Sequence, residues 1–316
     1  ANFILSKREK KNKNFRNEIK YLIDFHKNIF NYKYQYNLSS QFYYNQIINQ
    51  HFNKIKIKND QNIKNENDNI SPIFIIGLPR SGSTLIESIV TSGEEKIKTF
   101  GECNVVNISV LEQMGPKIYN KEFDVKKFEF EIDINKLKES LFKKYKQFNF
   151  QDELLNNIFV DKSLENIFNI NLILKIFPNA KFLHTFRNLE DSVISIYQSM
   201  LPELSWTHNI NDILVYIENY LKIIQYFKSN NPGIIMDIEL EHFTQNSEEV
   251  SKQIFEFCNL TWNKNVSKFY ERKDLPSKTL STIQIRSKVE TYEKKKYQPY
   301  YYLLSNYKKK YKWLDI

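Results

Sequence analysis

The feature that most constrains the fold of this chain is an apolar run followed at once by a short loop of glycine and hydroxyl residues. Pro72–Ile76 is predicted to be a buried strand, Gly77–Ser83 a turn, and Thr84–Ser92 a helix with an apolar face. The chain has only 6 Gly among its 316 residues, and two of them lie in this turn. A glycine kept in so glycine-poor a chain indicates a requirement of the backbone. The pattern therefore predicts a strand, an anion-binding loop and a helix in succession.

Residues 77–84 read Gly-Leu-Pro-Arg-Ser-Gly-Ser-Thr, which is close to the phosphate-loop pattern G-x-x-x-x-G-K-[ST]. Backbone N–H groups and the N-terminus of the following helix attract an anion of phosphate size. Ser83 stands where the pattern has a lysine that reaches the outer phosphates of a nucleoside triphosphate. The loop therefore favours a mononucleotide without a polyphosphate tail over ATP. The candidate binding residues are Pro79, Arg80, Ser81, Gly82, Ser83 and Thr84.

Further strands and helices alternate along the chain. Strands are predicted at Asn157–Val160, Ala180–Phe186 and Gly233–Ile238, and helices at 134–148, 164–177 and 248–258, with another opening near Leu189. This alternation predicts an α/β fold, a mostly parallel, P-loop-like sheet flanked by helices. Residues 286–316, rich in Tyr and Lys, are expected to be helical.

The N-terminal part predicts helices before this sheet begins. Residues 2–35 have helical periodicity with a polar break near Lys11–Asn14, which predicts a hairpin of two helices, and a third helix is predicted at Ser40–Phe52. The stretch Lys54–Asn69 is nearly all polar and predicts a linker or loop. We therefore expect a helical segment over 1–52, a polar linker over 53–71 and an α/β domain over 72–316.

Charge is distributed unevenly along the chain. Residues 1–71 carry 13 basic and 6 acidic side chains and residues 286–316 carry 9 and 3, whereas residues 72–285 carry 24 and 28. Because the basic excess lies at the two ends, the pattern argues against a nucleic-acid partner.

The remaining composition bounds the compartment and the chemistry. The two cysteines, Cys103 and Cys258, lack the spacing of a metal site and suit a reducing compartment. No apolar run approaches the roughly 20 residues of a membrane span, and the N-terminus does not read as a signal peptide. The five histidines show no ligand spacing, so no metal is expected. We expect a soluble, cytoplasmic protein without a membrane span.

The stretch Ile73–Thr84 resembles the 5′-phosphosulfate-binding loop of the sulfotransferases that use PAPS, 3′-phosphoadenosine 5′-phosphosulfate. It has the P-R-S-G-[ST]-T form of the tyrosylprotein and the bacterial repeat-linked branches, and the resemblance extends over roughly Pro72–Arg286. It implies a P-loop-like fold, PAPS as the donor, PAP as the product and no metal.

The resemblance also implies roles for residues outside the loop. Arg187 and Ser195 fit the 3′-phosphate pattern R-x-x-x-[DE]-x-x-x-S-x-Y. Glu102 follows Gly101 as in the family's G-E pair, and the resemblance makes it the general base that takes the acceptor's proton. Lys162, the second residue of an Asp-Lys pair, would stabilise charge on the oxygen between the sulfate and the departing phosphate.

The C-terminal part of the resemblance is less complete. Residues 281–286 are similar to S-x-x-Q-V-R, which implies that Ser281 contacts the sulfuryl group and Arg286 the 3′-phosphate. Beyond Arg286 the family's usual Gly and Trp are absent, and Val289–Tyr297 takes their place.

The stretch Ala1–Tyr36 resembles the end of a tetratricopeptide array that joins such a catalytic domain. Because those repeats bind peptides, the resemblance favours a protein or peptide acceptor, for example at tyrosine, while sugar and lipid hydroxyls stay open. Two other functions stay open as well. One is a metal-dependent nucleotide kinase on the same fold, and the other is a non-catalytic interaction protein that binds PAP.

Overall fold

The computed structural model describes residues 1–58, 69–93, 97–118, 129–148, 158–271, 292 and 296–315. The chain forms two compact units. The first unit consists of residues 1–50, 187–223 and 293–316, and the second of residues 51–186 and 224–292.

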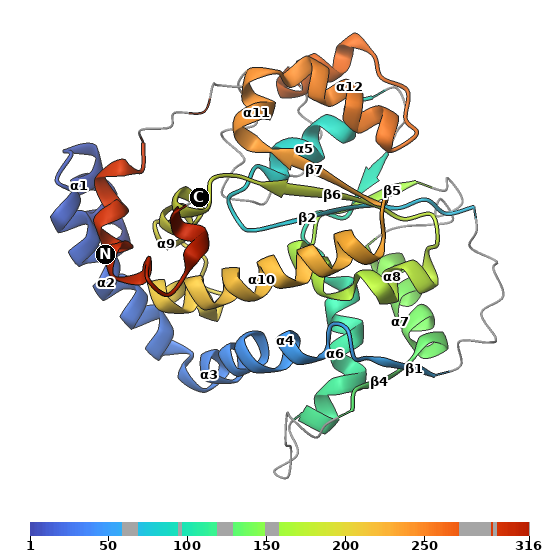
Figure 1. The fold of residues 1–316 in the computed structure, drawn as a ribbon, viewed down its shortest axis with the longest axis horizontal. Helices are drawn as coiled ribbons and strands as arrows, with labels where there is room; N and C mark the ends of the chain where they lie inside the picture. The colour runs from blue at the N-terminus through green and yellow to red at the C-terminus, as the bar shows by residue number, and fades with distance from the viewer. Residues whose placement is uncertain are drawn as a thin grey trace. The chain divides into compact units, whose positions relative to one another are not determined.

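The second unit is built on a five-stranded sheet whose strands lie in the order β3-β5-β2-β6-β7 (Figure 1). The strands are β2 (Ile73–Gly77), β3 (Lys98–Thr99), β5 (Phe159–Asp161), β6 (Lys181–Phe186) and β7 (Ile235–Glu239). All of these pairings are parallel. Strand β2 is central and every one of its residues is buried, which explains its unbroken apolar run.

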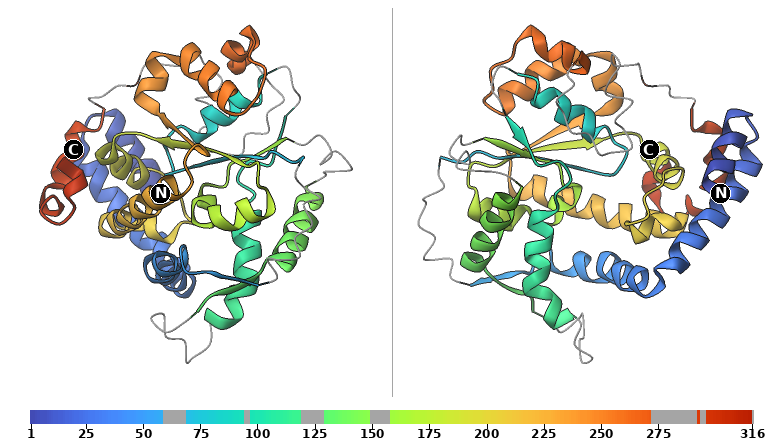
Figure 2. Two further views of the ribbon diagram at one scale, coloured as in Figure 1. Left: turned by 45° about the vertical axis from the view of Figure 1, so that its right-hand side comes forward. Right: turned by 180° about the vertical axis from the view of Figure 1, so that it is seen from behind.

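Helices cover both faces of this sheet, as Figures 1 and 2 show. On one face lie α5 (Ser83–Val90), α11 (Leu240–Gln245) and α12 (Ser247–Phe257), and on the other α6 (Val105–Ile118), α7 (Ile134–Gln147) and α8 (Ile170–Ile176). Alternate residues of β2 serve the two cores. Ile73 and Ile75 belong to the core that contains α5 and α12 residues, whereas Phe74 stacks on Phe182. The predicted α/β fold is confirmed.

A second, two-stranded parallel sheet pairs β1 (Lys56–Lys58) with β4 (Glu131–Asp133). Ion pairs join Lys56 to Glu129 at 2.5 Å and Lys58 to Glu131 at 2.6 Å. The stretch that we expected to be a polar linker thus includes a strand. The pattern did not predict it because the acidic partners of these lysines lie on a distant segment of the chain.

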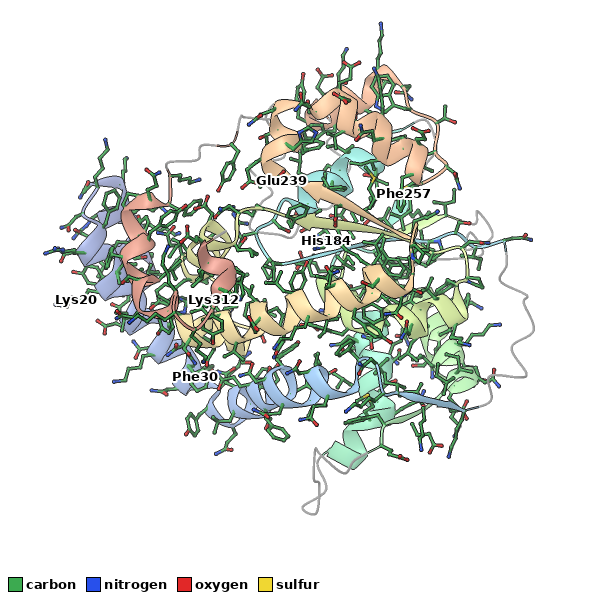
Figure 3. The ribbon with its side chains drawn as sticks, in the orientation of Figure 1. Lys20, Phe30, His184, Glu239, Phe257 and Lys312 are labelled. Carbon is green, nitrogen blue, oxygen red and sulfur yellow. The ribbon has the colours of Figure 1, made fainter. Side chains whose placement is uncertain are left out.

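The Asp237 carboxylate joins β7 to β6 and to α10 (Ile210–Asn230), and Figure 3 labels its partner on β6, His184. His184 on β6 lies with its Nδ1 2.6 Å from Asp237 Oδ1 on β7, and the Lys228 ammonium lies 2.7 Å from the same carboxylate. Burial lowers the pKa of His184. Burial alone raises the pKa of Asp237, but the hydrogen bonds from His184 and Lys228 outweigh it and lower that pKa to about 2. This histidine therefore has a structural role.

The first unit contains the predicted N-terminal hairpin, formed by α1 (Asn2–Lys11) and α2 (Phe15–Tyr32). The third helix begins earlier than we expected, because α3 (Tyr34–Phe42) continues through a π-helical turn into α4 (Ile48–His51). The first unit also contains α9 (Leu189–Tyr197) and residues 210–223 of α10.

Contacts in this unit join segments that lie far apart in the sequence. The Tyr300 hydroxyl donates to Glu18 at 2.5 Å, and His26 Nε2 lies 2.7 Å from the Tyr197 carbonyl oxygen. The N-terminal helices therefore share one core with residues after β6 and with the C-terminal segment. How the natural protein divides into domains stays a prediction.

Other elements differ from our expectations. The C-terminal residues are not one helix, because the described part forms short 3-10 turns at Gln298–Leu303, Ser305–Tyr307 and Lys312–Asp315. The expected helix over 164–177 begins as a 3-10 helix, Leu164–Asn169, before α8. We did not predict α6, α10 or α11. Among the helices that the structure describes, none is long and apolar enough to cross a membrane.

Candidate active site

The carboxyl ends of parallel strands meet at one edge of a sheet, and ligands of such folds bind there. The predicted loop follows β2, Glu102 follows β3, and Lys162 directly follows β5. All three belong to the second unit. Arg187 follows the last residue of β6 and belongs to the first unit, as does Ser195 on α9.

The backbone of the phosphate loop is shaped by residues with positive φ. These angles are 150° at Gly77, 69° at Arg80 and 92° at Gly82. Gly82 is also the N-cap of α5, whose first turn carries backbone N–H groups without helical acceptors. Such a turn of backbone N–H groups at a helix N-terminus binds anions. Ser83 and Thr84 lie in that first turn and are buried.

Ser81 fixes the loop to the neighbouring strand. Its hydroxyl donates to the Leu78 carbonyl oxygen at 2.7 Å and lies 2.7 Å from the Thr185 hydroxyl on β6. A Cβ atom at Gly82 would lie 2.8 Å from Leu240 Cδ1 on α11. The loop is therefore held from two sides, by β6 and by α11, before any ligand binds.

Gly77→Ala is expected to lower the free energy of unfolding by about 2 kcal/mol or more, because both strain and a collision act at this position. A Cβ atom there would lie 2.3 Å from the backbone oxygen of Thr185. Gly233→Ala is the matched control, since its φ is also positive, at 81°, but its Cβ would meet nothing within 4 Å. Urea denaturation of both variants measures the difference. Equal losses would show that backbone strain alone matters and that the loop tolerates the displacement.

Lys162 lies at the centre of a buried group of charges. Its side chain is fully buried, and its ammonium donates to Glu102 Oε1 at 2.7 Å. The backbone N–H of Lys162 donates to the Gly101 carbonyl oxygen at 3.0 Å, which holds the segments after β3 and β5 together. The Glu102 side chain is 51% exposed, so its carboxylate is accessible to an acceptor while its cationic partner is not. The structure thus brings together two of the three residues that we predicted to be catalytic, and the third, Ser281, lies outside the described residues.

A second carboxylate faces the same lysine, and we did not predict it. Glu87 on α5 lies with Oε2 3.6 Å from Lys162 Nζ, and its Oε1 accepts a hydrogen bond from the Thr99 hydroxyl at 2.5 Å. Burial raises the pKa of Glu87, while Lys162 and Thr99 oppose that rise. The signal in the sequence is weak, because Glu87 is simply the one charged residue of an otherwise uncharged helix.

Asp161, the residue before Lys162, is fully buried and satisfied by protein donors. Its Oδ1 accepts from the Ser163 N–H at 2.8 Å and from Asn166 Nδ2 at 3.1 Å. Its Oδ2 accepts from the Tyr145 hydroxyl at 2.7 Å and from Cys103 Sγ at 3.3 Å. These donors occupy the usual acceptor sites of a carboxylate, so Asp161 anchors the strand end. Among the described residues, no group of three or more His, Cys, Asp or Glu side chains could hold a metal ion.

In the first unit, Arg187 and Ser195 contact the same aromatic side chain. The Tyr297 hydroxyl donates to Ser195 Oγ at 3.3 Å, and the Arg187 guanidinium lies 4.8 Å from the centre of the Tyr297 ring. Burial alone raises the pKa of Tyr297, but the charge of Arg187 and the hydrogen bond to Ser195 outweigh it and lower that pKa. Tyr297 was not predicted as a site residue. Ser281 and Arg286 lie outside the described residues.

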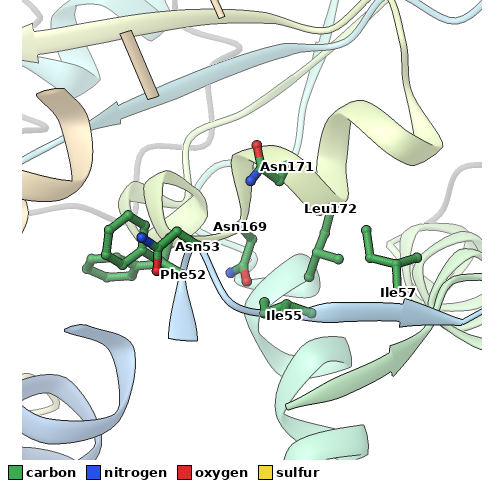
Figure 4. A pocket seen from close by; sticks show the side chains of 8 residues that line it. Phe52, Asn53, Ile55, Ile57, Asn169, Asn171 and Leu172 are labelled. Atoms are coloured by element: carbon green, nitrogen blue, oxygen red, sulfur yellow. The ribbon is translucent and has the colours of Figure 1, made fainter. Parts of the chain in front are cut away.

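Figure 4 shows a small cavity elsewhere in the second unit, with a volume of about 50 Å³. It is lined by Phe52, Asn53, Ile55, Ile57, Phe168, Asn169, Asn171 and Leu172. A water molecule takes up about 30 Å³ of liquid volume, and ligand pockets begin near roughly 300 Å³. The cavity is therefore too small for a nucleotide.

A parallel sheet covered by helices, with a phosphate loop after its central strand, defines a P-loop-like α/β protein. Residues 72–264 match the model of the sulfotransferase family, which is more than half of the chain, and the protein belongs to this family.

An uncharacterized protein of Aquifex aeolicus (strain VF5) is 31% identical over 251 residues, and the match covers 72% of this chain and 30% of that protein. The chain thus spans less than a third of the length of this relative. Among solved structures, the sulfotransferase domain of the Synechococcus PCC 7002 olefin synthase is 14% identical, with a TM-score of 0.45 over 71% of this chain and 86% of that one. The sulfotransferase domain of the curacin biosynthetic pathway is also 14% identical, with a TM-score of 0.43 over 67% and 82%.

Proposed function

We propose that this sulfotransferase moves a sulfuryl group from PAPS to a hydroxyl of a protein or peptide. The observation that carries the proposal is the pairing of an accessible carboxylate, Glu102, with a fully buried ammonium, Lys162. Glu87, the second carboxylate on that ammonium, lies on the helix that begins in the phosphate loop. Transfer of an anionic group to a hydroxyl requires a base, a cation and an anion-binding loop. In this site Glu102, Lys162 and the phosphate loop supply them.

The loop fits the phosphosulfate end of such a donor. It combines a helix N-terminus, closely packed glycines and a cation at Arg80, and it has a hydroxyl where triphosphate-binding loops have lysine. We assign the 5′-phosphosulfate to Pro79, Arg80, Ser81, Gly82, Ser83 and Thr84. We assign the 3′-phosphate to Arg187, Ser195 and Arg286, and contact with the sulfuryl group to Ser281. Ser81 acts by holding the loop, since its hydroxyl is bonded within it.

In the proposed reaction PAPS supplies an activated sulfuryl group, and no step needs a metal. Glu102 takes the proton of the acceptor hydroxyl, which makes its oxygen a better nucleophile. Lys162 lies buried behind Glu102, and the field of its ammonium stabilises the negative charge that develops on the oxygen leaving with the phosphate. The likeness of Ala1–Tyr36 to the end of a tetratricopeptide array supports a peptide acceptor, with tyrosine the first to test. The absence of a disulfide at Cys103 and Cys258 supports the cytoplasm as the place of action.

Calorimetric titration of the chain with PAP, and separately with ATP and Mg²⁺, tests the donor. We expect PAP to bind without metal and ATP to give no signal. Arg80→Ala should weaken PAP binding by at least about tenfold, because a hydrogen bond to a charged group contributes about 1.5–3 kcal/mol. The backbone φ is positive at position 80, and arginine and alanine are strained equally there. The difference in PAP affinity between the parent chain and Arg80→Ala therefore reports the loss of the guanidinium.

Lys252→Ala, which removes an equal charge from an exposed ion pair on α12, is the control and should leave PAP binding unchanged. Binding of ATP with Mg²⁺ and no binding of PAP would overturn the assignment in favour of a kinase. Binding of PAP without release of PAP from PAPS, over tyrosine peptides, sugars and lipid alcohols, would instead identify a non-catalytic PAP-binding protein.

A further inference from the structure

The second carboxylate on Lys162 has no role in the reaction described so far. Glu87 is 9% exposed, and its two oxygens have separate contacts, one to the Thr99 hydroxyl and one toward Lys162. Thr99 also accepts from the Gly101 N–H at 3.1 Å, at the residue before Glu102. Burying a carboxylate is costly unless it is paired, so its position beside the buried ammonium needs an explanation.

Among the residues that the structure describes, the charges around Lys162 do not balance. One ammonium faces two carboxylates, Glu102 at 2.7 Å and Glu87 at 3.6 Å. Among the described residues, Lys162 and Glu102 are the titratable groups whose charges act on Glu87, and Thr99, which donates to it, is uncharged. With all three groups ionised, the cluster carries one excess negative charge.

The excess disappears when the acceptor reacts. The acceptor oxygen forms its bond to sulfur, and its proton passes to Glu102. The bond between sulfur and the bridging oxygen breaks, and its electron pair leaves with the phosphate. Protonated Glu102 is then neutral and no longer balances Lys162. The departing phosphate balances the ammonium only until it leaves, a buried ammonium without a counter-charge is unstable, and Glu87 is the carboxylate that stays in place throughout.

We propose, on the basis of the function proposed above, that Glu87 is a positioning residue that acts as the permanent counter-ion of Lys162. It pairs with the ammonium and holds it in place while Glu102 carries the acceptor's proton. The shorter contact, to Glu102, is the one that the reaction breaks. The longer contact, from Glu87 on α5 and fixed by the hydrogen bond from Thr99, is the one that persists.

The ionisation of Glu87 tests this inference without any turnover. Carboxyl ¹³C NMR of glutamate-labelled protein, with the Glu87 signal identified by its loss in Glu87→Gln, reports whether the side chain is charged at pH 7. We expect it to be charged in the parent chain and to become protonated at that pH in Lys162→Met, where burial is no longer opposed by the ammonium. A Glu87 that is already protonated at pH 7 in the parent chain would overturn the inference, because it could not be a counter-ion.

Turnover supplies the second test. Glu87→Gln keeps the shape and the acceptor for Thr99, and we expect kcat to fall about tenfold to a hundredfold, the range seen when partners behind a functional group are removed at metal sites. KM for PAPS should change by less than about threefold. Glu87 positions the Lys162 ammonium, whose charge acts on the oxygen that becomes negative only in the transition state. Glu248→Gln, at an exposed position of α12, is the matched control and should leave kcat unchanged.

The acid side of the pH profile separates this role from a merely structural one. Glu87 must be ionised to balance Lys162, and burial raises its pKa, so log kcat of the parent chain should fall as the pH decreases. Glu87→Gln has lost this group, and its log kcat should fall less steeply over the same pH range. An unchanged kcat with an unchanged slope would contradict the inference. A parent chain without any transfer from PAPS would refute the proposed function, while the NMR result would still decide the role of Glu87.

Discussion

Lys162→Met is expected to lower the rate of sulfuryl transfer by about 10²–10³-fold, the effect of removing one group that stabilises charge in a transition state. The Lys162 side chain is fully buried, so no water molecule or neighbouring cation replaces its charge easily. Methionine keeps an unbranched side chain of similar length, so the change removes the ammonium more than the packing. Single-turnover rates with PAPS, with affinity for PAP measured in parallel, separate the chemical step from binding.

Two controls keep this result interpretable. Lys175→Met removes an exposed lysine from α8 of the same unit and should leave the rate unchanged. Thermal unfolding shows whether the loss of the ammonium, which leaves Glu87 buried without its cation, has unfolded part of the variant. A folded Lys162→Met chain with the parent rate would mean that the lysine serves only to pair the two carboxylates.

Much of the fold was predictable because its signals are local. The apolar residues of β2 are buried on both faces of a parallel sheet, and such a strand needs an unbroken apolar run. We expected the backbone to require glycine at position 77, and the structure shows why, because a Cβ atom there would collide with Thr185. The pair β1–β4 was missed because it depends on partners far away in the sequence, and polar strands look like linkers.

The catalytic pair was predicted from motifs, but the group around it was not. Glu87 looks like an ordinary helical glutamate in the sequence, and its burial follows only when β3 and β5 bring Thr99 and Lys162 to it. Tyr297 was missed for another reason. It lies in a segment where tyrosine and lysine are so common that no single residue is informative, and its contacts with Arg187 and Ser195 are set by tertiary structure.

Asp161→Ala is expected to lower the free energy of unfolding by about 3–5 kcal/mol. The carboxylate is fully buried, and its removal leaves the Tyr145 hydroxyl, the Asn166 amide and the Ser163 N–H without their acceptor. Each unsatisfied buried donor costs about 1–3 kcal/mol, although the site can relax or admit water and recover part of this. Urea denaturation, with the slope checked to be the same as in the parent chain, measures the loss.

Asp133→Ala provides the matched comparison, because it deletes a carboxylate that also accepts two backbone N–H bonds, from Asn135 and Lys136, but at the partly exposed N-cap of α7. Its expected cost is about 1 kcal/mol, the usual cost of losing such a cap. Tyr145→Phe, alone and combined with Asp161→Ala, completes a double-mutant cycle whose coupling should be positive and at least about 1 kcal/mol. If both aspartates cost the same, the buried network is not what holds the strand end beside Lys162, and the placement of that lysine must come from its pairing with Glu102 and Glu87.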